Sequence, residues 1–158
     1  MSLSSSQPSP SMLRLLADYK SMLDEPPEGV SASPVDEDNM FIWNATIFGP
    51  DETEWEGGIL PLILKFPEEY PSKPPKVRFT VPIFHPNVYN DGSICLDIIQ
   101  DKWRPIYTVN TILLSIQSLL TDPNPASPAN PMAAKIFSDN VREYKKRVRK
   151  FVQTSMGL

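Results

Sequence analysis

Eighteen prolines among 158 residues are the feature that most restricts how this chain can fold. Proline has no backbone N–H and its ring clashes with the preceding helical turn, so it is nearly excluded from helix interiors and central strands. The share of proline is well above that of an ordinary globular protein. Much of the backbone must therefore be fixed loop, and the regular elements must fit between the prolines.

Three segments between the prolines place apolar residues three and four positions apart, which is the spacing of one helical face. The predicted helices cover residues 11–23, 108–120 and 131–155. Pro26 and Pro27 end the first helix, and Pro123 ends the second. The third pattern weakens near Asp139 and Asn140, where we expect a break.

The middle of the chain is rich in β-branched and aromatic residues in two runs, 40–48 and 59–66, with a shorter run at 77–81. Glycines and a proline at 49–58 separate the first two runs, so we predict consecutive antiparallel strands. The order of helix, antiparallel strands, loop and helices predicts the α+β class. The length suits one domain, which we place at residues 11–158 after a Ser- and Pro-rich N-terminal tail at residues 1–10, predicted to be disordered.

Charge and cysteine content exclude several classes of function. A net charge of -4 argues against broad electrostatic binding to nucleic acid or to an anionic membrane, and no apolar run approaches the length of a membrane helix. One cysteine and one histidine cannot supply an intramolecular disulfide or a structural zinc site of four ligands. We therefore expect no metal or cofactor, and a protein of a reducing compartment, the cytoplasm, the nucleus or both.

The segment 82–109 is long, rich in turn residues, and holds both the only histidine and the only cysteine. Loops of this length in a compact domain are usually functional. A lone cysteine between Ile94 and Leu96 is by itself more often a buried apolar filler than a nucleophile. The polar turn residues around Cys95, from Gly92 to Asp97, favour a partly exposed thiol that could meet a partner.

The neighbours of the cysteine each allow two interpretations. His85 could be the base of a cysteine hydrolase, but Pro86 fixes its backbone and a structural role is favoured. Asn87 could support an oxyanion or could hydrogen-bond its own loop. Asp97 and Ser127 could position an incoming amine or could be solvated loop residues. An ordinary thiol is only partly ionised at neutral pH, so it suits exchange with an activated thioester better than attack on an amide.

The motif His85-Pro86-Asn87, with Cys95 eight residues beyond Asn87 and Trp103-Arg104-Pro105 downstream, resembles the catalytic core of ubiquitin-conjugating enzymes. Further signatures of that family match at 70–75 and at 123–125, so the resemblance covers nearly all of residues 12–152. The runs FHPNVY, DGSICLDI, SIQSLL and SPAN are most similar to the branch of DNA-damage tolerance and histone ubiquitination.

The resemblance implies a four-stranded antiparallel sheet with an N-terminal helix and C-terminal helices, and Cys95 in a shallow groove. It implies that Cys95 accepts ubiquitin as a thioester from an activating enzyme that consumes ATP, and passes it to lysines of protein substrates with a RING-type ligase. The enzyme itself would need no cofactor and would act as a monomer. The catalytic residues implied are Cys95, Asn87, His85, Asp97, Ser127 and Tyr89. Asn87 would support the oxyanion, so Asn87→Ala would slow transfer to lysine selectively.

Ligase contact is implied for the first helix and two loops, at Arg14, Ser72, Lys73, Trp103, Arg104, Pro105 and Ile106. The chain departs from the branch in the first helix, where Arg14 and Lys20 are the only basic residues, and at Arg104, where serine is common. These departures leave the identity of the activating enzyme and ligase open. The resemblance also places a tight turn at Tyr70-Pro71, a candidate cis peptide.

Three other functions compete with this interpretation. Members of the fold that lack the cysteine act as non-catalytic binding modules, and other members conjugate different ubiquitin-like modifiers. A cysteine hydrolase is the third. Incubation with an activating enzyme, ATP and each modifier would separate them, because only a conjugating enzyme forms a thiol-sensitive adduct.

Overall fold

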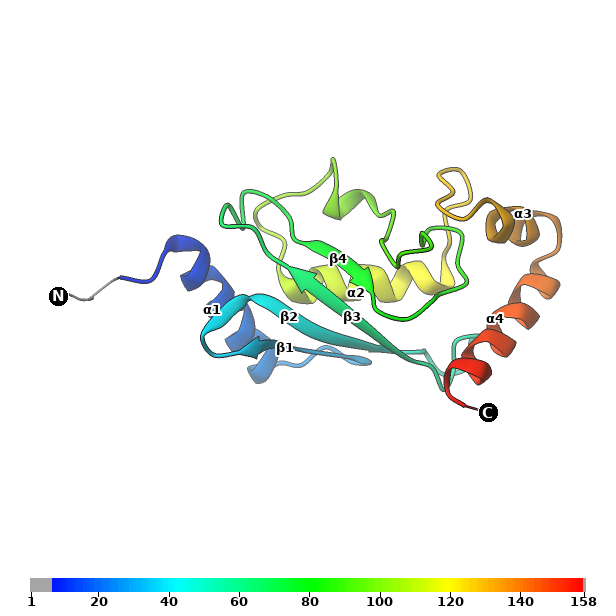
Figure 1. The fold of residues 1–158 in the computed structure, drawn as a ribbon, viewed down its shortest axis with the longest axis horizontal. Helices are drawn as coiled ribbons and strands as arrows, with labels where there is room; N and C mark the ends of the chain where they lie inside the picture. The colour runs from blue at the N-terminus through cyan, green and yellow to red at the C-terminus, as the bar shows by residue number, and fades with distance from the viewer. Residues whose placement is uncertain (1–6, 158) are drawn as a thin grey trace.

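The computed structural model describes residues 7–157, and within that range it contains four α-helices, one short 3-10 helix and a four-stranded sheet (Figure 1). The elements are α1 Pro10–Asp24, β1 Val30–Asp36, β2 Asn39–Phe48, β3 Ile59–Lys65, β4 Lys76–Phe79, η1 Asp97–Ile99, α2 Val109–Thr121, α3 Pro131–Asp139 and α4 Val141–Ser155. The α+β class and the three predicted helical regions are confirmed.

The sheet is antiparallel throughout, in the order β1-β2-β3-β4. Its inner face alternates as a half-buried strand should, with Leu60, Leu62 and Leu64 of β3 buried and their neighbours more exposed. The residue pattern predicted β2, β3 and β4 but did not find β1. That strand, VSASPVD, lies at the sheet edge, where Pro34 is tolerated and little apolar patterning is needed.

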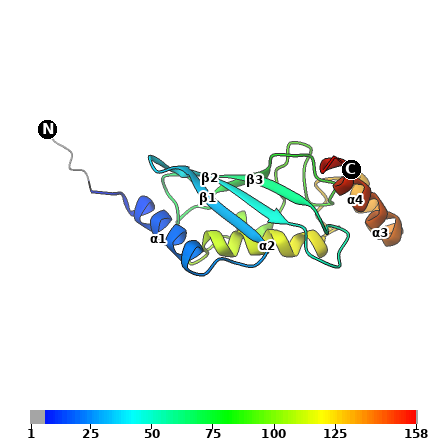
Figure 2. The ribbon, with the colours of Figure 1, turned by 90° about the horizontal axis from the view of Figure 1, so that it is seen from below.

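Helix α2 crosses one face of the sheet, as the two perpendicular views show (Figures 1 and 2). Its apolar side is fully buried at Ile112, Leu113 and Ile116. Helix α1 lies at one end of the molecule and α3 with α4 at the other (Figure 1). This arrangement leaves the loops between β4 and α3 on one side of the domain, and those loops carry the candidate site.

The N-terminal end of α1 lies slightly earlier than the pattern indicated. The helix begins at Pro10, and the Ser9 side chain accepts a hydrogen bond from the Met12 backbone N–H as its N-cap. Residues 1–6 of the predicted tail lie outside the described residues. Ser9 and Pro10 therefore belong structurally to the helix rather than to a tail.

The predicted break in the C-terminal helical region is confirmed. Asn140 ends α3, and its side chain caps α4 by accepting from the Glu143 backbone N–H. The Tyr70-Pro71 peptide is cis, as expected. Among residues 7–157, none of the helices has the length and apolar composition needed to cross a membrane.

Candidate active site

The loop that carries the cysteine packs closely against strand β4 of the sheet at Gly92. The backbone there adopts φ +92°, and a Cβ at this position would lie 2.0 Å from the carbonyl oxygen of Phe79 in β4. Phe79 N–H donates to the Gly92 carbonyl at 2.8 Å. Only glycine fits both the left-handed conformation and this close approach, so Gly92 fixes where the loop turns back.

The turn brings Cys95 back beside Asn87. The Cys95 backbone N–H donates to the Asn87 carbonyl at 2.8 Å, and Val88 pairs with Ile94 as an isolated antiparallel bridge. Asn87 and Cys95, eight positions apart in the sequence, are therefore the two ends of a small loop that this hydrogen bond closes. Ile94 is buried while Cys95 is only half-buried, so the thiol is held at the surface on a fixed backbone.

Cys95 opens into a shallow pocket of about 440 Å³. The residues that line it with Cys95 are Leu96, Asp97, Gln100, Asp101, Lys102, Leu119, Asn124 and Ser127. The pocket thus has one thiol, polar side chains from two loops, and the apolar Leu96 and Leu119, the latter from α2. It is open to solvent, which suits a macromolecular partner rather than an enclosed small ligand.

The side chain of Asn87 joins the cysteine loop to the loop before α3. Its Oδ1 accepts from the Asn124 backbone N–H at 2.8 Å, and its Nδ2 donates to the carbonyls of Asn124 at 2.8 Å and Ser127 at 3.1 Å. The residue is buried, and both amide protons are used. This geometry supports the loop-holding role for Asn87, and an oxyanion role requires that one of these bonds be released.

Ser127 reaches the thiol pocket because the loop before α3 is bonded at two places. Pro86 supplies the second, its carbonyl accepting from the N–H groups of Ala129 and Asn130 at 2.8 and 3.0 Å. Ser127 is exposed and lines the Cys95 pocket. Ser127, a catalytic residue implied by the family resemblance, therefore lies in the wall of the thiol pocket, and its role stays a prediction.

His85 is fully buried, and its ring is occupied on both sides. Nδ1 accepts from the Asn87 backbone N–H at 2.9 Å, so the proton lies on Nε2, which donates to the Leu119 carbonyl at 2.7 Å. Burial lowers the pKa of His85 to about 4. A neutral imidazole whose two ring nitrogens are both hydrogen-bonded, and which has no access to solvent, cannot serve as the base of a cysteine hydrolase. His85 instead organises the loop.

Asp97 and Tyr89 line different hollows of the surface. Asp97 opens the short helix η1, lines the pocket, and forms an exposed ion pair with Lys102 at 3.7 Å. Tyr89 is exposed but lines a neighbouring hollow with Ser93 and Ala129. Asp97 is therefore a wall residue of the thiol pocket, whereas Tyr89 is not among the residues that line it.

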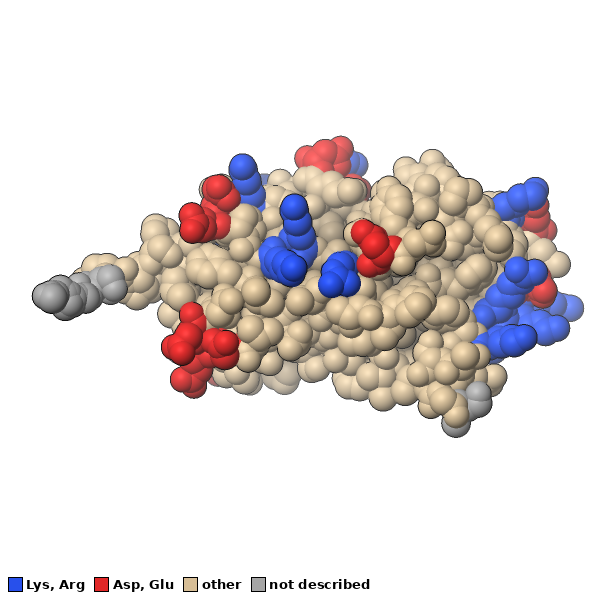
Figure 3. Space-filling view, viewed as in Figure 1, with Lys and Arg blue, Asp and Glu red and all other residues tan. Residues whose placement is uncertain are grey.

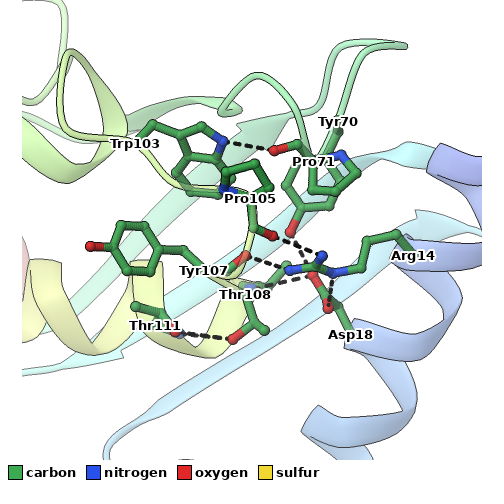
Figure 4. Close-up of polar contacts among 10 residues, drawn as sticks. Arg14, Asp18, Tyr70, Pro71, Trp103, Pro105, Tyr107, Thr108 and Thr111 are labelled. Atoms are coloured by element: carbon green, nitrogen blue, oxygen red, sulfur yellow. Dashed lines mark hydrogen bonds and ion pairs between the residues drawn. The ribbon is translucent and has the colours of Figure 1, made fainter.

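Arg14 does not present a free charge to a partner. Its guanidinium donates to the carbonyls of Pro105 at 2.9 Å and Tyr107 at 2.6 Å, and to the buried carboxylate of Asp18 at 3.1 Å (Figure 4). The ring of Tyr70 lies 5.6 Å beneath it. Each of the three guanidinium nitrogens donates a hydrogen bond within the fold, so Arg14 fixes the loop at 105–107, and its contact with a ligase stays a prediction.

Trp103 joins the two loops expected to contact the ligase. Its indole N–H donates to the Pro71 carbonyl at 2.8 Å, and its ring packs against those of Tyr70 and Tyr107 (Figure 4). The remaining predicted contact residues, Ser72, Lys73, Arg104, Pro105 and Ile106, are exposed. Ile106 is the most prominent, with 67% of its surface accessible. The structure brings the two loops together, with Arg14 and Trp103 as their supports.

Six residues that line the thiol pocket were not identified as site residues from the sequence: Leu96, Gln100, Asp101, Lys102, Leu119 and Asn124. Asn124 exchanges hydrogen bonds with Asn87, and its position between Pro123 and Pro125 was the available signal. Lys102 pairs with Asp97 at 3.7 Å, and their spacing of five residues has no periodic pattern that predicts this contact. Over the described range, no cluster of three or more His, Cys, Asp or Glu residues could hold a metal ion.

Comparisons of the chain with known proteins identify a family. A family model described as "Ubiquitin-conjugating enzyme" matches residues 14–152. A protein of Caenorhabditis elegans named "Ubiquitin-conjugating enzyme E2 1" is 56% identical over 146 residues, which are 92% of this chain and 76% of that protein. "Ubiquitin-conjugating enzyme E2 3" of Arabidopsis thaliana is 55% identical over 146 residues, covering 92% of this chain and 97% of its own length.

Proposed function

The chain belongs to the ubiquitin-conjugating enzyme family, and from this premise we propose that Cys95 is the residue on which it carries ubiquitin. It is a transferase that works through a thioester intermediate, with ubiquitin, an activating enzyme and a ligase as its partners. A thioester needs a thiol, and Cys95 is the only cysteine in the sequence.

The observation that carries the proposal is the half-exposed thiol on a fixed backbone. In charging, the Cys95 sulfur attacks the carbonyl carbon of the ubiquitin thioester on the activating enzyme. The new C–S bond forms, the old one breaks, and the departing sulfur takes the proton that Cys95 gives up. Because one thioester replaces another, the step needs access and alignment rather than a strong base. The open pocket at Cys95 supplies access, and the Asn87 carbonyl fixes the backbone.

In discharge, a lysine amine attacks the same carbonyl carbon, an amide bond forms, and the sulfur of Cys95 leaves. Asp97 and Ser127, which line the thiol pocket, orient the approaching amine by hydrogen bonds, and the proton that the amine loses passes to the departing Cys95 sulfur. Asn87 keeps the loop of Ser127 in position. His85 holds the Asn87 backbone, whose N–H donates to its Nδ1, and takes no part in proton transfer.

The ligase proposed is of the RING type, bound at the exposed tips of two loops. Ser72 and Lys73 lie on one loop, and Arg104, Pro105 and Ile106 on the other. The Trp103 hydrogen bond to Pro71 supports this assignment, because it holds the two tips in one surface. The exposed Ile106 beside Pro105 gives that surface an apolar centre, and Lys73 and Arg104 give it a basic rim.

The finer assignments are part of the same proposal. The runs FHPNVY and DGSICLDI support membership in the DNA-damage-tolerance and histone-ubiquitinating branch. A working free thiol supports a reducing compartment, the cytoplasm, the nucleus or both. We propose that the enzyme acts as a monomer, because one chain already supplies every residue of the pocket. Measuring the transfer of ubiquitin to nucleosomal histones tests whether the chain belongs to this branch.

The experiment for the main proposal is a charging assay. The protein is incubated with activating enzyme, ATP and ubiquitin, and the products are separated with and without reducing agent. A ubiquitin adduct that reducing agent removes is the expected result. No adduct with ubiquitin, together with one formed from another ubiquitin-like modifier, would contradict the proposal.

A further inference from the structure

Helix α4 concentrates positive charge in a chain that is acidic overall. The helix carries six of the fifteen basic residues of the sequence, and Glu143 is its one acidic residue. The basic residues are Arg142, Lys145, Lys146, Arg147, Arg149 and Lys150. Figure 3 shows them gathered at the end of the molecule where α4 lies, away from α1. Charge of one sign, concentrated on one surface, attracts a partner of the opposite sign.

Beside this charge lies an open groove of about 580 Å³. Two half-buried aromatic side chains, Phe84 and Phe151, form its apolar part, and Lys146, Arg147 and Lys150 line it with their charged groups. Glu143 also lines it and pairs with Arg147 at 3.6 Å, so the rim is basic by three positive groups against one negative. A ligand that carries negative charge and one large apolar group complements this groove.

The floor of the groove is held by aromatic packing and is adjacent in sequence to the cysteine loop. Phe84 packs against the buried ring of Tyr144, which packs in turn against Phe137 of α3, with centroids 5.9 and 5.1 Å apart. Phe84 directly precedes His85, whose ring holds the Asn87 backbone. A ligand in the groove thus contacts the segment that leads into the cysteine loop.

The geometry favours a protein segment over a membrane or a nucleic acid. A membrane-surface helix must insert its apolar side, but Tyr144, Val148 and Val152 of α4 are buried in the fold. A duplex would extend past the single helix onto a surface of net negative charge. A short acidic segment is confined to α4, and its apolar side chain can enter between the two phenylalanines.

We propose that the groove along α4 binds an acidic segment of protein substrates, anchored by one large apolar side chain. The role of this groove in recruiting substrates rests on the proposed function of Cys95. Its ability to bind an acidic peptide depends only on the groove itself. Its effect is to raise the local concentration of the acceptor lysine near the thiol.

The binding test uses the full chain and a fluorescein-labelled peptide of Glu and Asp residues around one central Phe, followed by fluorescence anisotropy. We expect saturable binding that weakens as salt rises to about 0.3 M. The double variant K146E/K150E should weaken binding about tenfold or more. The control K65E/K76E changes the net charge equally on exposed strand positions that face each other in β3 and β4, and should change binding less than twofold.

Replacing the central Phe of the peptide with Ser should also weaken binding about tenfold, since the aromatic anchor is lost. Equal binding by K146E/K150E and the unaltered chain would overturn the proposal, as would equal affinity for the Phe and Ser peptides. Tighter binding of a DNA duplex than of the peptide would overturn it as well. Both double variants should keep their thermal stability, because Lys and Glu have similar helix propensity and the strand positions are solvent-exposed.

A second measurement separates this proposal from the function of Cys95. Charging is measured on the same preparations, and K146E/K150E should charge normally. Lysine transfer is then compared between an acidic peptide and a neutral one that carry the same acceptor lysine. The acidic peptide should be preferred several-fold by the unaltered chain, and K146E/K150E should lose that preference. Failure of charging would overturn the function of Cys95 while leaving peptide binding intact, whereas equal use of both peptides would overturn the substrate role of the groove.

Discussion

The side-chain amide of Asn87 donates to the backbone carbonyl of Ser127 at 3.1 Å, across 40 positions of sequence. With two further bonds to Asn124, this contact holds the loop before α3 against the cysteine loop. The buried amide of Asn87, together with the Pro86 carbonyl, therefore holds the two walls of the thiol pocket in place. Both of its protons point to carbonyls rather than into the pocket.

Replacing Asn87 with Ala should release this loop. We expect charging, exchange with a small thiol and transfer to lysine to slow together, and the melting temperature to fall, with an unfolding free energy lower by about 1 to 3 kcal/mol. The three rates and the melting temperature are measured on one preparation. A selective loss of lysine transfer at unchanged stability would instead support the oxyanion role inferred from the family resemblance.

Replacing Asn87 with Asp is the matched control for that measurement. Aspartate keeps an acceptor for the Asn124 backbone N–H but sets a carboxylate oxygen against the carbonyls of Asn124 and Ser127. We expect losses similar to those of Asn87→Ala, since the donors are the groups that hold the loop.

Cys95→Ala should form no adduct with ubiquitin, because it removes the only thiol in the sequence. Cys95→Ser should form an adduct slowly and keep it longer, since an oxyester is less activated than a thioester. The test is gel analysis after incubation with activating enzyme and ATP, followed by reducing agent. A reductant-sensitive adduct on Cys95→Ala would show that the thioester forms elsewhere.

The buried His85 should make stability depend on pH. Its folded pKa, about 4, lies below the unfolded value of 6.5, so the unfolded chain binds more protons between these values. Its contribution is complete above about pH 6.5 and is lost as pH falls toward 4, up to about 3 kcal/mol. Denaturant unfolding across this range measures it. His85→Asn, which keeps an acceptor near the Asn87 N–H, should lose that slope yet still accept ubiquitin.

Arg14→Lys should loosen the loop at 104–107, because an ammonium group cannot replace the three-way contacts of the guanidinium. We expect unfolding free energy to fall by about 1 to 3 kcal/mol and the Tyr107 amide, which bonds to the Arg104 carbonyl, to exchange faster. Arg104→Ala is the control, since that side chain is exposed and should not change stability. Equal exchange at Tyr107 in both variants would count against the supporting role of Arg14.

The N-terminal residues before Ser9 should be dispensable for charging. Deleting residues 1–8 should leave the rate of thioester formation and the melting temperature unchanged, because α1 keeps its cap. Ser9→Ala in the full chain should cost about 1 kcal/mol, since the Met12 N–H loses its partner. Loss of charging on deletion would instead place part of the activating-enzyme contact in these residues.

Local patterns in the sequence were enough to predict the helices, three of the strands and the loop that holds the cysteine. Helical and strand periodicities are properties of neighbouring residues, and the break at Asn140 is a local capping signal. The strand β1 had no such signal, because an edge strand gains its stability from pairing with β2 rather than from its own apolar pattern.

The sequence by itself also indicated the chemistry, through the resemblance of the motif of His85, Asn87 and Cys95 to ubiquitin-conjugating enzymes. Only the tertiary structure decided which polar groups are free to act. Arg14 carries N–H donors suited to contact with a partner, and Asn87 carries donors suited to catalysis. In the structure, backbone carbonyls distant in sequence accept hydrogen bonds from both side chains. Hydrogen bonds between distant segments depend on how the elements pack, and packing has no local pattern from which such pairings can be read.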